Sequence, residues 1–71
     1  MDAAERKTIE LSRDAAILEW QAHGVVARAR TGEAKRRAEQ EADRALKRVI
    51  DLTRQIDPAK GKILASVFDA G

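Results

Sequence analysis

Residues 22–42, with the sequence AHGVVARARTGEAKRRAEQEA, contain the break in pattern that decides the fold. A stripe of apolar and small residues at alternating steps of three and four ends at Ala29, and a second such stripe begins at Ala38. The separation of nine residues fits neither a seven- nor an eleven-residue helical repeat. We therefore expect the chain to reverse at Thr31-Gly32, where glycine supplies a backbone conformation that other residues resist. The alternative is a bend at Gly24, but the first stripe continues unbroken past it.

The first helix is predicted over residues 3–30 and has two apolar faces. Asp2 and Glu5 have the spacing of a capping box at its start. One face, the long stripe, consists of Ala4, Thr8, Leu11, Ala15, Leu18, Ala22, Val25 and Ala29. The opposite face, the short face, consists of Ile9, Ala16, Trp20 and Ala27, with Arg13 and His23 interrupting it. Because a helix with two apolar faces is usually covered on both sides, we expect this helix to lie between its neighbours, with the long stripe against the second helix.

The second helix is predicted over residues 33–56 and the third over residues 58–69. The stripe of the second helix consists of Ala38, Ala42, Ala45, Val49, Leu52 and Ile56. Asp57 is a good N-cap and Pro58 suits the first position of the third helix, in which Gly61 lowers helix stability by about 1 kcal/mol relative to Ala. The apolar face of this helix consists of Ala59, Ile63, Leu64, Val67 and Phe68. The sequence predicts one all-α domain over residues 1–71: a long antiparallel hairpin with a short third helix, as a three-helix bundle or a helical dimer.

The composition of the 71-residue chain excludes several classes of protein. It has no Cys, which excludes disulfides and Cys-based zinc sites. Only 3% of its residues are aromatic. No run of about 18 apolar residues occurs, and the charged N-terminal segment has no apolar core, so we expect neither a membrane span nor a signal peptide. We expect a cytoplasmic protein, and the excess of Ala and Arg suits a GC-rich bacterial genome. Chains this short often gain stability by oligomerising, so we predict a homodimer or other homo-oligomer.

No pattern in the chain indicates catalysis. His23 is the only imidazole, and Glu19 lies one turn before it, but a metal site needs three or four ligands. The Ser and Thr residues have no sequence pattern that pairs them with His23, and the four glycines are scattered rather than gathered in a phosphate-binding loop. We therefore predict no catalytic residue, no metal, no cofactor and no small-molecule substrate.

The apolar surfaces of the first and third helices are the first candidate site. They favour a small regulatory or interaction protein that self-associates or binds a partner, with Trp20 as an anchor, because Trp is enriched where binding energy concentrates. Packing of the third helix on Trp20 within one chain is an equal alternative to a contact between Trp20 and another molecule. The residues predicted for this interface are Ile9, Ala16, Trp20, Ile63, Val67 and Phe68.

The basic middle of the chain is the second candidate site. Residues 28–56 hold nine basic and five acidic side chains, a net charge of +4. The planar guanidinium group of arginine matches the geometry of phosphate, so the alternative function is a DNA-binding regulator of plasmid or phage type. An acidic protein is another candidate partner. The simplest interpretation is a charged surface that contacts only solvent. The third helix is too apolar for a recognition helix. The candidate nucleic-acid-binding residues are Arg28, Arg30, Lys35, Arg36, Arg37, Arg44, Lys47 and Arg48.

Overall fold

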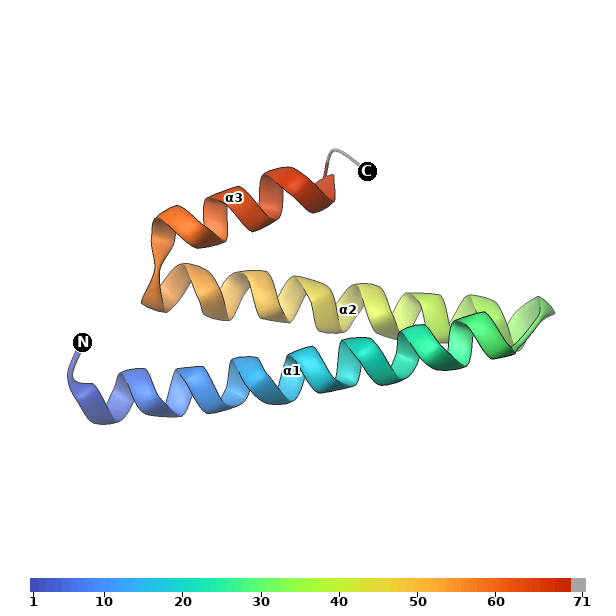
Figure 1. Cartoon of the computed structure of the whole chain (residues 1–71), viewed down its shortest axis with the longest axis horizontal. Coiled ribbons are helices and arrows are strands. Elements are labelled where there is room, and N and C mark those ends of the chain that lie inside the picture. Colours follow the sequence, from blue (N-terminus) through green and yellow to red (C-terminus); the bar gives the residue numbers. More distant parts are fainter. Residues whose placement is uncertain (70–71) are drawn as a thin grey trace.

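The computed structural model describes residues 1–69 and is helical along almost all of them. The helices are α1 (Ala3–Ala29), α2 (Gly32–Ile56) and α3 (Pro58–Asp69), with no strand among the described residues. Helices α1 and α2 form an antiparallel hairpin, and α3 turns back along α2 (Figure 1). The predicted all-α fold with three helices is confirmed.

The local signals that begin and end the helices act as the sequence predicts. The Asp2 Oδ1 atom accepts a hydrogen bond of 2.8 Å from the backbone N–H of Glu5, and the Asp57 Oδ1 atom accepts one of 3.2 Å from Lys60. Gly32 has a φ of +64°, the left-handed region that favours glycine, and it follows the two non-helical residues of the turn. Gly24 lies within α1. The turn is therefore at Thr31-Gly32, and the bend at Gly24 does not occur.

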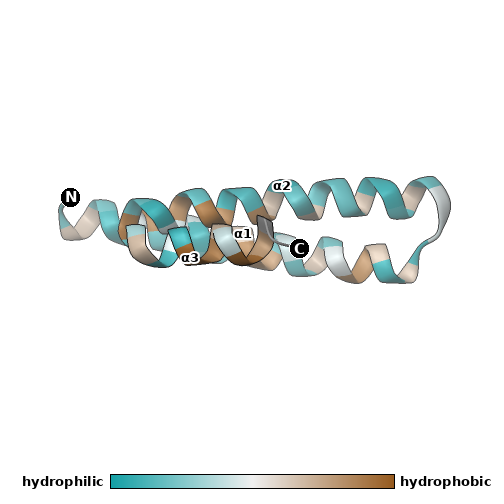
Figure 2. Ribbon diagram, turned by 90° about the horizontal axis from the view of Figure 1, so that it is seen from above, coloured by the Kyte–Doolittle hydropathy of each residue, from teal (hydrophilic) through white to brown (hydrophobic). Residues whose placement is uncertain are grey.

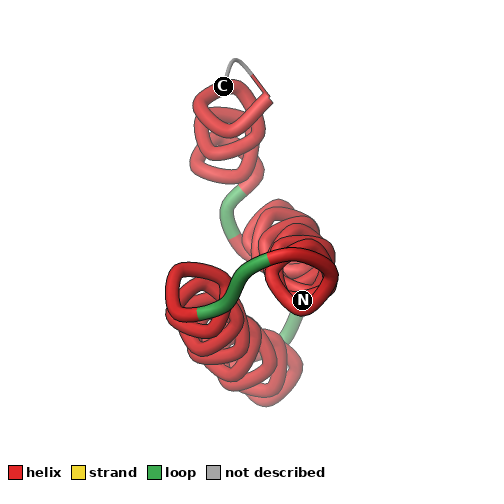
Figure 3. Tube along the Cα trace, turned by 90° about the vertical axis from the view of Figure 1, so that its right-hand side faces the viewer, coloured by secondary structure: helices red, strands yellow, loops and turns green. Residues whose placement is uncertain are grey.

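The three helices form a flat layer with α2 in the middle. The molecule measures 45 × 25 × 12 Å, and its smallest dimension is close to the diameter of one helix. The end view in Figure 3 shows α2 between α1 and α3. The expectation that the first helix lies in the middle is wrong. Helix α2 can contact both neighbours because Ile50 and Thr53, which are buried beside its main stripe, widen its inward surface.

The stripe of α2 lies inside the hairpin, as expected. Ala38, Ala45 and Val49 are buried, and Leu52 and Ile56 are half-buried. The buried Thr53 hydroxyl donates a hydrogen bond of 2.7 Å to the Val49 carbonyl oxygen, so its polar atom is satisfied without a partner from another helix.

The face that α1 turns toward α2 is the opposite of the expected one. On the short face, Ala16 is 2% exposed and Ala27 8% exposed. On the long stripe, Leu11 is 60%, Leu18 66% and Val25 58% exposed. The expectation that the long stripe packs against the second helix is therefore wrong.

Trp20 supplies a physical reason for this choice of face. The Trp20 and Phe68 ring centroids lie 5.9 Å apart with an interplanar angle of 78°, an edge-to-face contact that joins α1 to α3. With the long stripe inward, the indole ring would point away from α3 and lose this contact. The short face thus combines small residues, which allow close helix approach, with one large ring that reaches the third helix.

Helix α3 packs on α2 through its smallest residues. Gly61 and Ala65 are buried, whereas Ile63 and Val67 are 63% and 61% exposed. A Cβ atom added to Gly61 would lie 2.8 Å from the Arg54 Cα atom and 2.9 Å from the Arg54 backbone N. The exposed Ile63 and Val67 are therefore left for another contact, while α3 approaches α2 closely at a glycine that the sequence marks only as a weak helix former.

Candidate interaction surfaces

The long stripe forms a continuous apolar line on α1, on the side away from α2. Its spacing of three and four residues keeps all eight positions on one face of the helix, which spans about 38 Å from Ala4 to Ala29. Its three largest members, Leu11, Leu18 and Val25, are each more than half exposed. Soluble monomers expose few large contiguous apolar patches, so this line is a candidate interaction surface. The sequence pattern identifies these residues but assigns them to the inside of the hairpin.

The six residues predicted for an interface fall into two groups in the structure. Ile9, Ala16 and Trp20 lie on the short face, and Ala16, at 2% exposed, has no surface left for a partner. Phe68 is 39% exposed and contacts Trp20, so it belongs partly to the internal packing. The two remaining residues, on the outer face of α3, are the exposed Ile63 and Val67.

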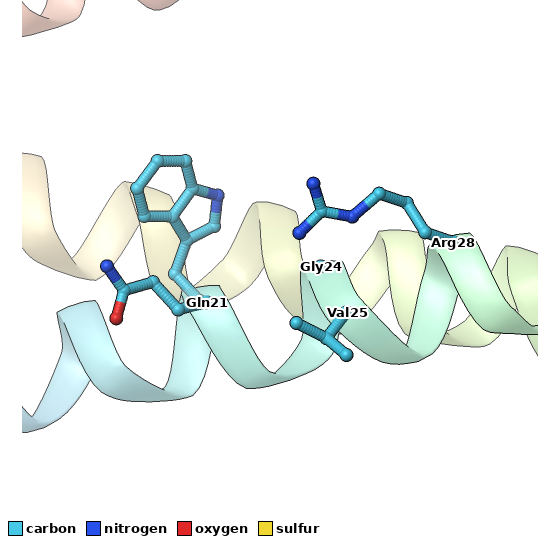
Figure 4. Close-up of a pocket in the computed structure, with 5 residues that line it drawn as sticks. Gln21, Gly24, Val25 and Arg28 are labelled. Atoms are coloured by element: carbon cyan, nitrogen blue, oxygen red, sulfur yellow. The ribbon is translucent and has the colours of Figure 1, made fainter.

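An open groove of about 580 Å³ runs along α1 beside Trp20. Its other lining residues are Gln21, Gly24, Val25 and Arg28. Figure 4 shows the Arg28 side chain running back along the helix above Gly24, where the missing side chain leaves open space. Its polar side-chain groups are the Arg28 guanidinium, the Gln21 amide and the Trp20 indole N–H, and none of them is a nucleophile or half of an acid–base pair.

The basic candidates gather around the hairpin turn. Arg28 and Arg30 come from the end of α1, and residues 35–37 come from the first turns of α2. All five are exposed, and none takes part in the ion pairs found within the described part of the chain. Figure 2 shows that α2 is largely hydrophilic in its half next to the turn. We call Arg28, Arg30, Lys35, Arg36 and Arg37 the basic tip.

The other basic candidates lie farther along α2 and are also exposed. The Arg44 Nη1 atom lies 3.2 Å from the Glu41 Oε1 atom, so part of its charge is already neutralised. Arg48 lies one turn after Arg44 on the same side of α2, and Lys47 lines a pocket together with Ala65 of α3. They extend the basic tip along the hairpin without forming a separate site.

Residues 1–69 show no candidate metal centre. No three His, Asp or Glu side chains in that range come together as metal ligands, and His23 is half-buried in the hairpin. None of the described helices is both long and apolar enough to cross a membrane. Comparison of the chain with protein-family models, with curated proteins and with solved structures finds no match. Function is therefore inferred from the chain's own surfaces.

Proposed function

We propose that this protein is a small non-enzymatic interaction module that works by self-association, and that the long stripe of α1 is the contact between two copies. The observation that carries the proposal is the line formed by Leu11, Leu18 and Val25. These side chains are exposed on a helix whose other face is already occupied by α2. This places the contact on the opposite side of α1 from the surface that the sequence predicts.

The stripe is large enough for a dimer of moderate affinity. Burying the exposed part of each large side chain contributes about 1–2 kcal/mol, and a symmetric dimer buries six of them, a gain of about 6–12 kcal/mol. Association opposes this with a loss of translational and rotational freedom of about 4–15 kcal/mol, while the alanines of the stripe add favourable contact. At the favourable ends of these two ranges, a gain of about 12 kcal/mol and a loss of about 4 kcal/mol leave a net of about 8 kcal/mol, which corresponds to a dissociation constant in the micromolar range.

Sedimentation equilibrium tests the proposal directly. Between about 1 and 200 micromolar protein, the apparent mass should rise from 7.8 kDa toward twice that value, because this range brackets a micromolar dissociation constant. Circular dichroism of the same samples reports whether the helices are formed. A helical protein that stays at the monomer mass throughout the range contradicts the proposal.

Binding to the phosphate backbone of nucleic acid is the second candidate function, and the basic tip favours it. A mobility-shift titration with double-stranded DNA should show an affinity that falls steeply with salt, because bound cations release counterions from the DNA. Replacing Arg36 and Arg37 by Gln should lower the slope of log affinity against log salt by about 2. The matched control replaces Lys60 and Lys62, two exposed cations of α3, by Gln and should leave the slope unchanged. Absence of binding at low salt contradicts this candidate.

A further inference from the structure

We propose that two copies of the chain pair their α1 helices in antiparallel orientation, with the two-fold axis passing between Ala15 and Leu18. This inference rests on the proposed self-association and adds the orientation and register of the contact. The dimer would have the two α1 helices at its centre and an α2 helix on each outer side. Each basic tip would then lie at an opposite end of the assembly.

The sizes of the residues along the long stripe favour this register. Leucine and alanine alternate in the middle of the stripe, so a reversed second copy sets each leucine against an alanine. The facing pairs are Ala4 with Ala29, Thr8 with Val25, Leu11 with Ala22 and Ala15 with Leu18, each from opposite copies. A parallel pair in register would instead stack Leu18 on Leu18 and Ala22 on Ala22. The distance between the two helix axes is the same along the pair, so it cannot suit both the leucine layers and the alanine layers of a parallel dimer. The antiparallel register therefore fills the space between the helices better.

The charges beside the stripe favour the same orientation. In a parallel pair, Asp14 would lie beside Glu19 of the second copy, and symmetry would repeat this contact between like charges. In the antiparallel register, Asp14 lies beside the Gln21 amide of the second copy. The unfavourable antiparallel contact is that of Lys7 with Arg28 of the second copy, which symmetry also repeats, but it lies near the ends of the helix pair, where water screens the two charges.

The arrangement of the three helices leaves the stripe accessible along its full length. Helix α3 lies on the opposite side of α2 from α1, so it does not obstruct a second copy (Figure 1). The outer face of α3 from a second copy is a weaker partner for the long stripe, because its 12 residues would cover less than half of the 27-residue α1. Such a contact between unlike surfaces would also continue into an open chain of molecules instead of closing as a dimer.

Spin-label distances test the orientation with two single-cysteine variants. The natural chain has no Cys, so Ala3→Cys and Thr31→Cys each provide one site for a label. Both residues are exposed, and the Thr31 side chain makes no capping hydrogen bond that the substitution would remove. A mixture of the two labelled chains should give a short Ala3-to-Thr31 distance. Chains labelled only at Thr31 should give about 44 Å, from a rise of 1.5 Å per residue on each side of the axis.

The outcomes separate the inference from the proposed function. A dimer with short same-site distances and a long mixed distance is parallel, which overturns the inference and leaves self-association standing. Masses that grow beyond the dimer point to an open chain and also overturn it. A folded protein that sediments as a monomer and gives no dipolar signal overturns both. A second label pair, Lys7→Cys with Arg28→Cys, should repeat the short mixed distance if the first pair perturbs the helix ends.

Discussion

Replacing Leu18 by Glu is expected to leave a folded monomer that no longer dimerises. The Leu18 side chain is 66% exposed, so the substitution removes little contact within one chain. In the dimer, two such carboxylates would be buried close to the two-fold axis, at a cost of several kcal/mol, and the burial of two leucines would be lost. The dissociation constant should therefore rise by at least about 100-fold, measured by sedimentation equilibrium.

The matched control is Ile63→Glu on the outer face of α3. Ile63 is 63% exposed, nearly the same as Leu18, and the change in charge and polarity is equivalent. We expect dimerisation to be unaffected by this variant. The reverse result, in which Ile63→Glu dissociates the dimer and Leu18→Glu does not, would place the contact on the surface predicted from the sequence and would contradict the one proposed from the structure.

Gly61→Ala is expected to loosen the packing of α3 and to destabilise the protein by about 1–2 kcal/mol. Helix propensity alone would predict a gain of about 1 kcal/mol. The added Cβ atom, however, would lie less than 3 Å from backbone atoms of Arg54, and the last turn of α2 cannot move aside without straining its own hydrogen bonds. Helix α3 must then shift outward and withdraw Phe68 from Trp20. Urea unfolding measures the free energy, and the emission of Trp20, the only tryptophan, should move to longer wavelength.

The same substitution at Gly24 provides the control. Gly24 lies within α1, and a Cβ atom there would meet nothing within 4 Å, so Gly24→Ala should stabilise the protein by about 0.5–1 kcal/mol. Both variants should be compared at one protein concentration, because dimerisation contributes to the measured stability. The interpretation of Gly61 is wrong if the two substitutions change the free energy of unfolding in the same direction, or if the Trp20 emission of Gly61→Ala matches that of the natural protein.

The local structure of this protein follows from short-range signals in its sequence. The carboxylate caps, the proline at the start of α3 and the glycine at the turn each act within a few residues, so Asp2, Asp57 and Gly32 could be assigned correctly without any tertiary information. The inward stripe of α2 was predictable too, because this helix has one strongly apolar side and a charged opposite side.

The use of each face of α1 was decided only by the tertiary structure. The spacing of residues shows that this helix has two apolar faces, but periodicity is the same for a face that packs within the chain and for one that packs against another molecule. The choice depends on contacts between residues far apart in sequence: Trp20 with Phe68, and Gly61 with Arg54. By itself, the sequence determined three helices, their caps and the turn between the first two. Packing around α2 determined that the long stripe of α1, with Leu11, Leu18 and Val25, faces outward, since only the short face lets the indole of Trp20 reach the third helix.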